Sequence, residues 1–168
     1  MTDLKSFVQS QLAQQAVVER VDWFKRKEKW LLELKNLFEM IKTSLVDAGL
    51  NAAQIVELEQ RLQEETLGVY KAPKLTVKLP AGGTVEFRPV ASVILGGYGR
   101  VDVGGPAKYR VRLIAEDASE DRAEDDSTPA YEREWKWSVY PGVGMSASFP
   151  FDEQGLARIL AIVTGAAK

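Results

Sequence analysis

The feature that most constrains the fold is a change of pattern near the middle of the chain. From Asp3 to Ala48 the sequence contains no proline and no glycine, and good helix formers dominate it. After Gly68, short runs of alternating apolar and polar residues are separated by turns rich in glycine and proline. A helical period therefore gives way to the period of two that is typical of β-strands, and the sequence predicts an α+β protein.

The first of these segments predicts a long amphipathic helix. From Leu31 onward, apolar residues recur at heptad spacing in a stripe that is broader than a coiled-coil seam. The charged run 25–29 interrupts this stripe, which leaves open whether the helix is continuous or breaks near residues 16–29. Gly49 suits the left-handed residue that follows a helix. A separate apolar face lies further upstream, at Leu4, Phe7, Val8 and Leu12.

A second, shorter helix is predicted over residues 52–67. Asn51 suits its N-cap, and Gly68 would end it. Because the connection between the two helices is short, they are expected to lie antiparallel as a helical hairpin, a coiled-coil-like arm over residues 1–68. The apolar positions at helical spacing in the second helix are Ile55, Leu58 and Leu62.

The remainder of the chain predicts a β-domain. Residues 69–73 are expected to form a linker, because Pro73 is there and the helical period is lost. Residues 74–168 then predict an antiparallel meander of about six or seven strands, curled or closed into a small barrel, with one C-terminal helix. Asp152 suits the N-cap of that helix, and Gly165 would stop it.

The chain contains no histidine and no cysteine, which restricts its chemistry. Thiolate nucleophiles, the usual zinc sites and the Ser-His-Asp triad are excluded, so no cofactor and no metal is predicted. One catalytic possibility remains. Asp117, followed by Glu134 and Lys136 on the next strand, fits a metal-dependent nuclease in which the carboxylates hold Mg²⁺ and the lysine stabilises the attacked phosphate. Because Glu-x-Lys is a common tripeptide, the favoured prediction is a protein without enzymatic activity.

A net charge of −2 conceals an uneven distribution of charge. Basic residues dominate residues 71–112, and acidic residues dominate residues 116–134. These segments either neutralise each other or bind ligands. Arg110 and Arg112 are expected to face Glu132 and Glu134 across neighbouring strands as ion pairs.

An alternative function is nucleic-acid binding through basic strands and stacking aromatics. The acidic segment and the net charge oppose it, and the tryptophans are expected to lie in the core. The candidate ligand-binding residues are Arg100, Arg110, Arg112, Trp135 and Trp137.

Protein–protein interaction is the predicted function. A shorter second helix would cover only part of the first, so the rest of the apolar stripe must meet the β-domain or another chain. The chain is expected to be an adaptor, inhibitor or accessory subunit that forms a homo-oligomer or binds a protein partner. An immunity- or defence-type role fits a small acidic protein, although no residue specifies it. The candidate interface residues are Trp23, Phe24, Trp30, Leu31, Leu34 and Phe38.

A cytoplasmic location without membrane association is expected. No apolar core of a signal peptide follows the first residues, and the weakly polar run 90–99 is much shorter than the ~20 residues of a membrane helix.

Overall fold

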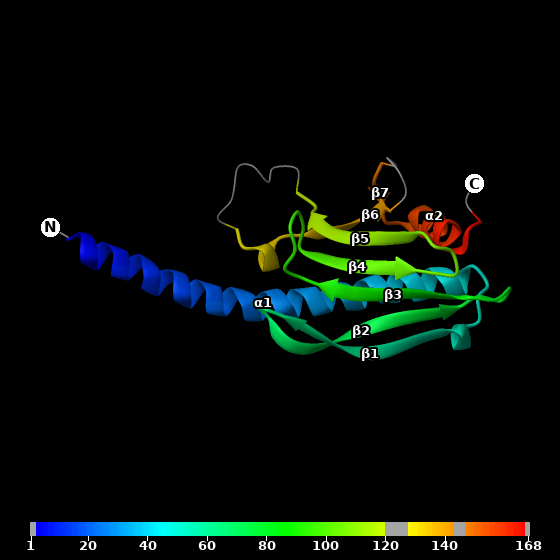
Figure 1. Ribbon diagram of the computed structural model, residues 1–168, viewed down its shortest axis with the longest axis horizontal. Coiled ribbons are helices and arrows are strands. Elements are labelled where there is room, and N and C mark those ends of the chain that lie inside the picture. Colours follow the sequence, from blue (N-terminus) through cyan, green and yellow to red (C-terminus); the bar gives the residue numbers. More distant parts are fainter. Residues whose placement is uncertain (1–2, 120–127, 143–146, 167–168) are drawn as a thin grey trace.

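The computed structural model describes residues 3–119, 128–142 and 147–166, and within 14–22 it describes only the backbone. Its elements are one long helix, an antiparallel sheet and a C-terminal helix (Figure 1). The helices are α1 (Leu4–Asp47) and α2 (Glu153–Thr164), and the 3-10 turns are η1 (Ala52–Gln54) and η3 (Ala130–Glu132). The strands are β1 (Ile55–Glu64), β2 (Gly68–Lys78), β3 (Thr84–Ala91), β4 (Gly99–Gly104), β5 (Arg110–Asp117), β6 (Trp135–Pro141) and β7 (Phe149–Pro150).

The sheet is an open meander. Its seven strands lie in sequence order, and each pairs antiparallel with the next. The predicted α+β class and antiparallel meander are therefore confirmed. The sheet does not close into the small barrel that was the alternative, because β1 and β7 remain at its two edges.

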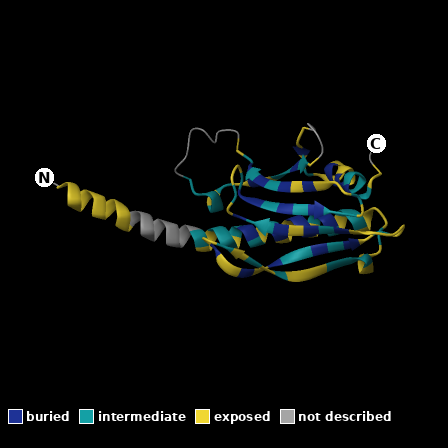
Figure 2. Cartoon of the chain, in the orientation of Figure 1, coloured by how far each residue is buried: buried dark blue, intermediate teal, exposed yellow. Residues whose placement is uncertain are grey.

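Both α-helices contribute to one hydrophobic core on the same face of the sheet, called the inner face below. The second half of α1 runs along this face, and its N-terminal half projects beyond the sheet (Figures 1 and 2). Alternate residues of each strand, such as Val101 and Val103 of β4, point into the core. Fully buried members of the core include Trp30, Leu34, Phe38, Ile41, Phe87, Leu113 and Ile159.

α1 is one continuous helix, which resolves the question that the sequence left open. Asp3 caps its start by accepting a hydrogen bond from the Ser6 N–H at 2.7 Å. Gly49 follows its end with a φ of +112°, in the left-handed conformation expected there. The helical hairpin and its coiled-coil-like arm are not formed, because the chain leaves α1 for a strand.

Residues 52–67, predicted as a second helix, form η1, the whole of the β1 strand and the turn at 65–67 instead. Asn51 is a cap as expected, but it caps a single 3-10 turn by accepting from the Ala53 N–H at 2.9 Å. β1 then pairs with β2 continuously from Ile55↔Val77 to Glu64↔Gly68. Residues 69–73, predicted as a linker, therefore belong to β2. Tertiary pairing overrides local helix preference here, because the apolar residues of β1 fit a period of two as well as a helical one.

The β1–β2 hairpin twists strongly along its length. On β2 the buried residues are Tyr70 and Ala72, and then Leu75 and Val77. Ala72 and Leu75 are three residues apart, so their side chains point to opposite faces of the strand. The two halves of the hairpin therefore bury opposite faces. A right-handed twist of this kind is usual in two-stranded ribbons, and it carries the distal half of the hairpin towards α1.

The C-terminal helix forms as predicted. Asp152 accepts a hydrogen bond from the Gly155 N–H at 2.7 Å, and Gly165 ends the helix with a φ of +82°. The buried side chains of α2 are Leu156, Ile159 and Val163.

Among the described glycines, Gly99 of β4 lies closest to a helix side chain, the indole of Trp30. A Cβ at Gly99 would lie 2.2 Å from Cζ3 of Trp30, so the indole requires a bare backbone on β4. We predict that Gly99→Ala lowers the free energy of unfolding by about 1–3 kcal/mol, because the methyl group overpacks a closed core. Urea denaturation measures this change.

Gly104→Ala on the same strand is the matched control. Its Cβ would meet the flexible Arg110 side chain, with 2.9 Å to Nε, and that side chain can move. A loss below about 1 kcal/mol is expected for this variant. Equal losses at the two glycines would contradict the proposed fit of Trp30. Trp30→Leu should also lessen the effect of Gly99→Ala, since the two side chains share one space.

Candidate functional site

α1 leaves the domain through a cluster of polar and aromatic side chains, which we call the helix junction: Arg26, Trp30, Glu64, Tyr70, Ser92, Tyr98, Asp117 and Arg133. One part of it ties α1 to the β1–β2 hairpin. Trp30 Nε1 donates to the Tyr70 hydroxyl at 3.1 Å, and that hydroxyl donates to the Glu64 carboxylate. Glu64 in turn accepts from the backbone N–H groups of Ser92 and Val93, at 3.0 and 2.9 Å. Burial and the Glu64 carboxylate raise the pKa of Tyr70, so its hydroxyl stays protonated as a donor.

Arg26 ties α1 to the segment that connects β3 and β4. Its guanidinium donates to the Ser92 carbonyl at 3.0 Å and to the Ser92 hydroxyl at 3.3 Å. It also lies 5.4 Å from the ring centroid of Tyr98. Burial lowers the pKa of Arg26, while Tyr98 and Glu64 oppose that shift, and a guanidinium remains charged in any case.

The basic run 25–29 contributes two further contacts with aromatic rings. Lys25 Nζ lies 5.3 Å from the ring centroid of Tyr131, and Lys29 Nζ lies 5.5 Å from that of Trp135. These separations permit cation–π attraction. The charged run 25–29, which interrupts the apolar stripe in the sequence, therefore helps to hold α1 against η3 and β6.

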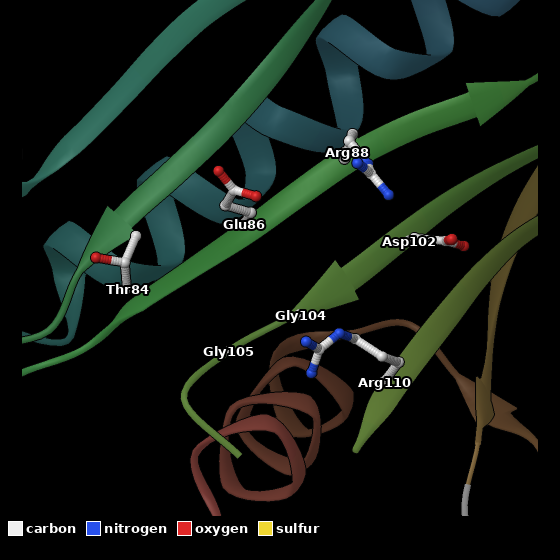
Figure 3. A pocket seen from close by; sticks show the side chains of 7 residues that line it. All are labelled: Thr84, Glu86, Arg88, Asp102, Gly104, Gly105 and Arg110. Atoms are coloured by element: carbon white, nitrogen blue, oxygen red, sulfur yellow. The ribbon is translucent and has the colours of Figure 1, made fainter. Parts of the chain in front are cut away.

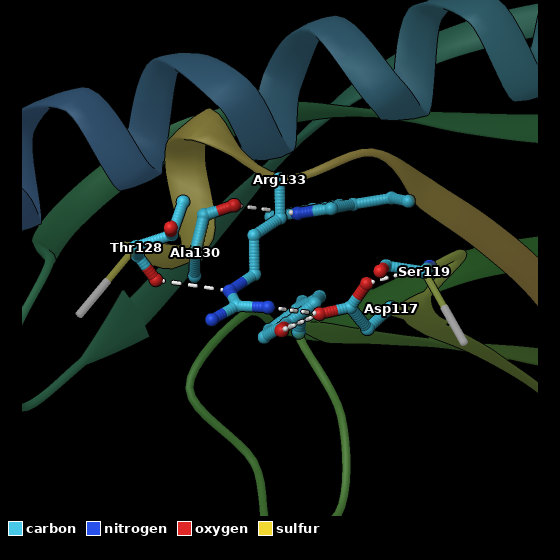
Figure 4. A network of polar contacts seen from close by, with 7 residues as sticks. Asp117, Ser119, Thr128, Ala130 and Arg133 are labelled. Atoms are coloured by element: carbon cyan, nitrogen blue, oxygen red, sulfur yellow. Dashed lines mark hydrogen bonds and ion pairs between the residues drawn. The ribbon is translucent and has the colours of Figure 1, made fainter. Parts of the chain in front are cut away.

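Asp117 forms the second part of the junction (Figure 4). Its carboxylate accepts from Arg133 Nη1 at 2.8 Å, from the Tyr98 hydroxyl at 3.1 Å and from the Ser119 N–H at 2.8 Å. Burial would raise the pKa of Asp117, but the Ser119 N–H, Arg133 and Tyr98 outweigh it, and the pKa lies below its ordinary value. The carboxylate is thus fully ionised and occupied by donors, as expected of a structural anchor.

The three nuclease candidates do not converge. Asp117 lies opposite Trp135 in the β5–β6 ladder and points to the inner face. Lys136 is exposed, lies opposite Glu116 and points to the other, outer face of the sheet, while Glu134 is exposed just before β6. In the described residues, no group of three or more histidines, cysteines, aspartates or glutamates could hold a metal ion. The carboxylates of Asp117 and Glu134 point in opposite directions, so the sequence spacing that suggested a nuclease does not bring them together.

Most of the predicted interface stripe is covered by the chain's own sheet. Trp30, Leu34 and Phe38 are fully buried in the core. Trp23 and Leu31 are partly buried against that core. Phe24 alone of the six candidates is largely exposed, at 59%.

The predicted ligand-binding residues divide between the two faces of the sheet. Arg100 and Arg112 lie on the outer face, and Arg110 at the start of β5 is also exposed there. Trp135 and Trp137 lie against the inner face. Trp135 stacks on Tyr98 with 5.1 Å between ring centroids, and Trp137 lies 6.1 Å from Trp30. The tryptophans are core residues, as the sequence suggested.

The ion pairs predicted from Arg110 and Arg112 to Glu132 and Glu134 are not formed. Arg112 lies opposite Tyr140 in the β5–β6 ladder, whereas both glutamates precede β6. The outer face instead pairs Arg100 with Asp102 at 2.6 Å and Lys74 with Glu86 at 3.2 Å. Much of the acidic segment, at 120–127, lies outside the described residues.

Comparison with protein-family models, with curated proteins and with solved structures found no match to this chain. None of the helices in the described part combines the length and the apolar character that a membrane crossing requires.

The buried Asp117–Arg133 pair should dominate the acid sensitivity of the fold. We predict that Asp117→Asn lowers the free energy of unfolding at pH 7 by about 3–5 kcal/mol, because the buried Arg133 guanidinium loses the charge of the Asp117 carboxylate. Since the folded-state pKa of Asp117 is depressed, its stabilisation is present above its ordinary value of 3.8 and is lost as the pH falls below it. Urea titrations at pH 7 and at about pH 3 should show a smaller acid-induced loss in the variant.

Asp102→Asn is the matched control, because it removes the same charge from a more exposed ion pair. The side chains of Arg100 and Asp102 are 37% and 25% exposed, against 11% and 2% for Arg133 and Asp117. A loss below about 1 kcal/mol is expected for the control. If both variants lower the free energy of unfolding equally, Asp117 is not a buried anchor of the fold.

Proposed function

We propose that the protein is a non-enzymatic protein–protein interaction module that associates through the projecting part of α1, residues 4–22, called the helical arm below. The observation that carries this proposal is exposed apolar surface on a helix that extends beyond the domain (Figure 2). Leu4, Phe7, Val8 and Leu12 are 79%, 55%, 43% and 59% exposed. Their spacing places them along one side of the helix.

Burial of this surface would favour association. Covering a leucine, valine or phenylalanine side chain contributes about 1.5–3 kcal/mol each when burial is complete. The arm is about 28 Å long at ~1.5 Å per residue, which is long enough for several such contacts along a second helix. The sheet cannot supply this cover, because its inner face is already filled by the second half of α1 and by α2.

The charge pattern of the arm favours a second copy of this chain as its partner. From Ser6 to Val18 the sequence contains no aspartate, glutamate, lysine or arginine. A neutral surface gives a charged partner little to recognise, and two identical neutral helices do not repel each other. Homo-oligomerisation through paired arms therefore agrees with this surface better than docking onto an acidic or basic protein.

The other functions have less support. Nucleic-acid binding would need the arginines and tryptophans on one surface, and they occupy opposite faces of the sheet. Nuclease chemistry would need Asp117, Glu134 and Lys136 to converge, and their side chains diverge. An adaptor or accessory role remains the proposal, with the β-domain carried at the end of the associating arm.

The prediction is that Phe7→Asp combined with Leu12→Asp dissociates the assembly. Charges placed in an apolar helix contact are costly to bury, so the double variant should have the mass of a monomer. Light scattering coupled to size-exclusion chromatography measures this mass. The wild-type chain should exceed the monomer mass of 18.7 kDa by a whole-number factor.

Leu95→Asp is the control, because Leu95 is fully exposed and lies in the segment between β3 and β4 instead of the arm. It should leave the mass unchanged. A monomeric wild type, or an unchanged mass in the double variant, would refute association through the arm. Variants of Trp23 and Leu31 are less suitable, since both side chains pack against the core and their loss would disturb folding.

A further inference from the structure

The outer face of the sheet carries a polar depression that the proposed association does not use. It has a volume of about 420 Å³ and lies over β4, between β3 and β5 (Figure 3). Thr84, Glu86 and Arg88 of β3 line one side, and Arg110 of β5 lines the other. Asp102, Gly104 and Gly105 lie between them. This volume lies within the range of small-molecule sites.

The charges of this depression do not cancel. Glu86 is paired with Lys74, and Asp102 receives two hydrogen bonds from Arg100, at 2.6 and 3.0 Å. Both carboxylates are thus neutralised by cations outside the lining. Arg88 has no ion pair with any described residue, and Arg110 bonds only to carbonyl oxygens there. Two guanidinium groups that form no ion pair with a described residue therefore line one space, although Asp102 lies opposite Arg88 in the β3–β4 ladder.

Two contacts direct the Arg110 side chain over the floor of the depression. Its Nη1 donates to the Ala107 carbonyl at 2.8 Å, and its side chain lies close over the bare backbone of Gly104. A Cβ at Gly104 would lie 2.9 Å from Arg110 Nε. The glycine thus lets the guanidinium approach the floor of the depression, where it presents its remaining N–H groups.

We propose that this depression binds a small phosphate-bearing molecule through Arg88 and Arg110. A tetrahedral phosphate can accept hydrogen bonds from guanidinium groups on two sides, whereas one arginine already satisfies both oxygens of a carboxylate. Thr84 adds a hydroxyl donor at the rim. A divalent cation fits poorly, because the two carboxylates already have cationic partners. The volume exceeds that of inorganic phosphate, so the ligand is an organic phosphate whose other polar groups meet Glu86 and Asp102.

Titration of the protein with inorganic phosphate and with glucose 6-phosphate, followed by NMR of the arginine Nε–H groups, tests this site. Sodium chloride at equal ionic strength is the reference. We expect saturable shifts of Arg88 and Arg110 with both probes, and tighter binding of glucose 6-phosphate. Arg88→Gln and Arg110→Gln should each weaken binding about tenfold or more, since each removes a charge-assisted contact.

Arg112→Gln is the matched control, because it removes the same charge from the same face but does not line the depression. It should weaken binding less than about threefold, the effect of general electrostatics alone. Equal weakening by all three variants would show a diffuse charge effect and would overturn the site. Absence of saturable shifts with either probe would also overturn it. The site does not depend on the arm, so a monomeric protein could still confirm it.

Discussion

The fold depends on one contact, the indole of Trp30 against the bare backbone of Gly99. α1 can lie this close to the inner face because β4 offers no side chain at that position, and a Cβ there would overlap the indole. The indole N–H is buried and would be costly without a partner, but the Tyr70 hydroxyl accepts it at 3.1 Å. That bond ties the twisted end of the β1–β2 hairpin to α1. Helix, sheet and hairpin thus meet at a single side chain.

The sequence predicted the elements whose signals are local. The caps at Asp152 and Gly165, the glycine after α1 and the strand–turn periodicity all follow from neighbours in the chain, and the structure contains them. The β1 strand could not be predicted in this way. Residues 55–64 carry helix-forming glutamates, glutamines and leucines, and their extended form depends on ten consecutive pairings with β2. Local preference of well under 1 kcal/mol per residue is easily outweighed by a complete ladder on one edge.

The candidate site was less predictable, because it depends on which face each side chain takes. Alternation along β6 already separates Trp135 and Trp137 from Lys136. Alternation along β5 likewise places Asp117 on the buried side, with Leu113 and Ala115. Its position opposite Trp135 needs the register of β5 against β6, which no local pattern encodes. The link from Arg26 to Ser92 joins residues 66 positions apart, and nothing in either segment signals it. The covered stripe of α1 was misassigned for the same reason, since a second helix was expected to cover part of it and the sheet covers it instead.

The structure therefore separates three kinds of surface on one small chain. Aromatic and apolar residues of the inner face pack against α1. The helical arm, which is uncharged from Ser6 to Val18, and the arginine-bearing outer face remain open to solvent. These two surfaces use different forces. Contact through the arm would rest on apolar burial, which salt does not screen, whereas attraction of a phosphate to Arg88 and Arg110 weakens as ionic strength rises. Because the forces differ and the surfaces lie on different elements, occupation of one need not compete with the other.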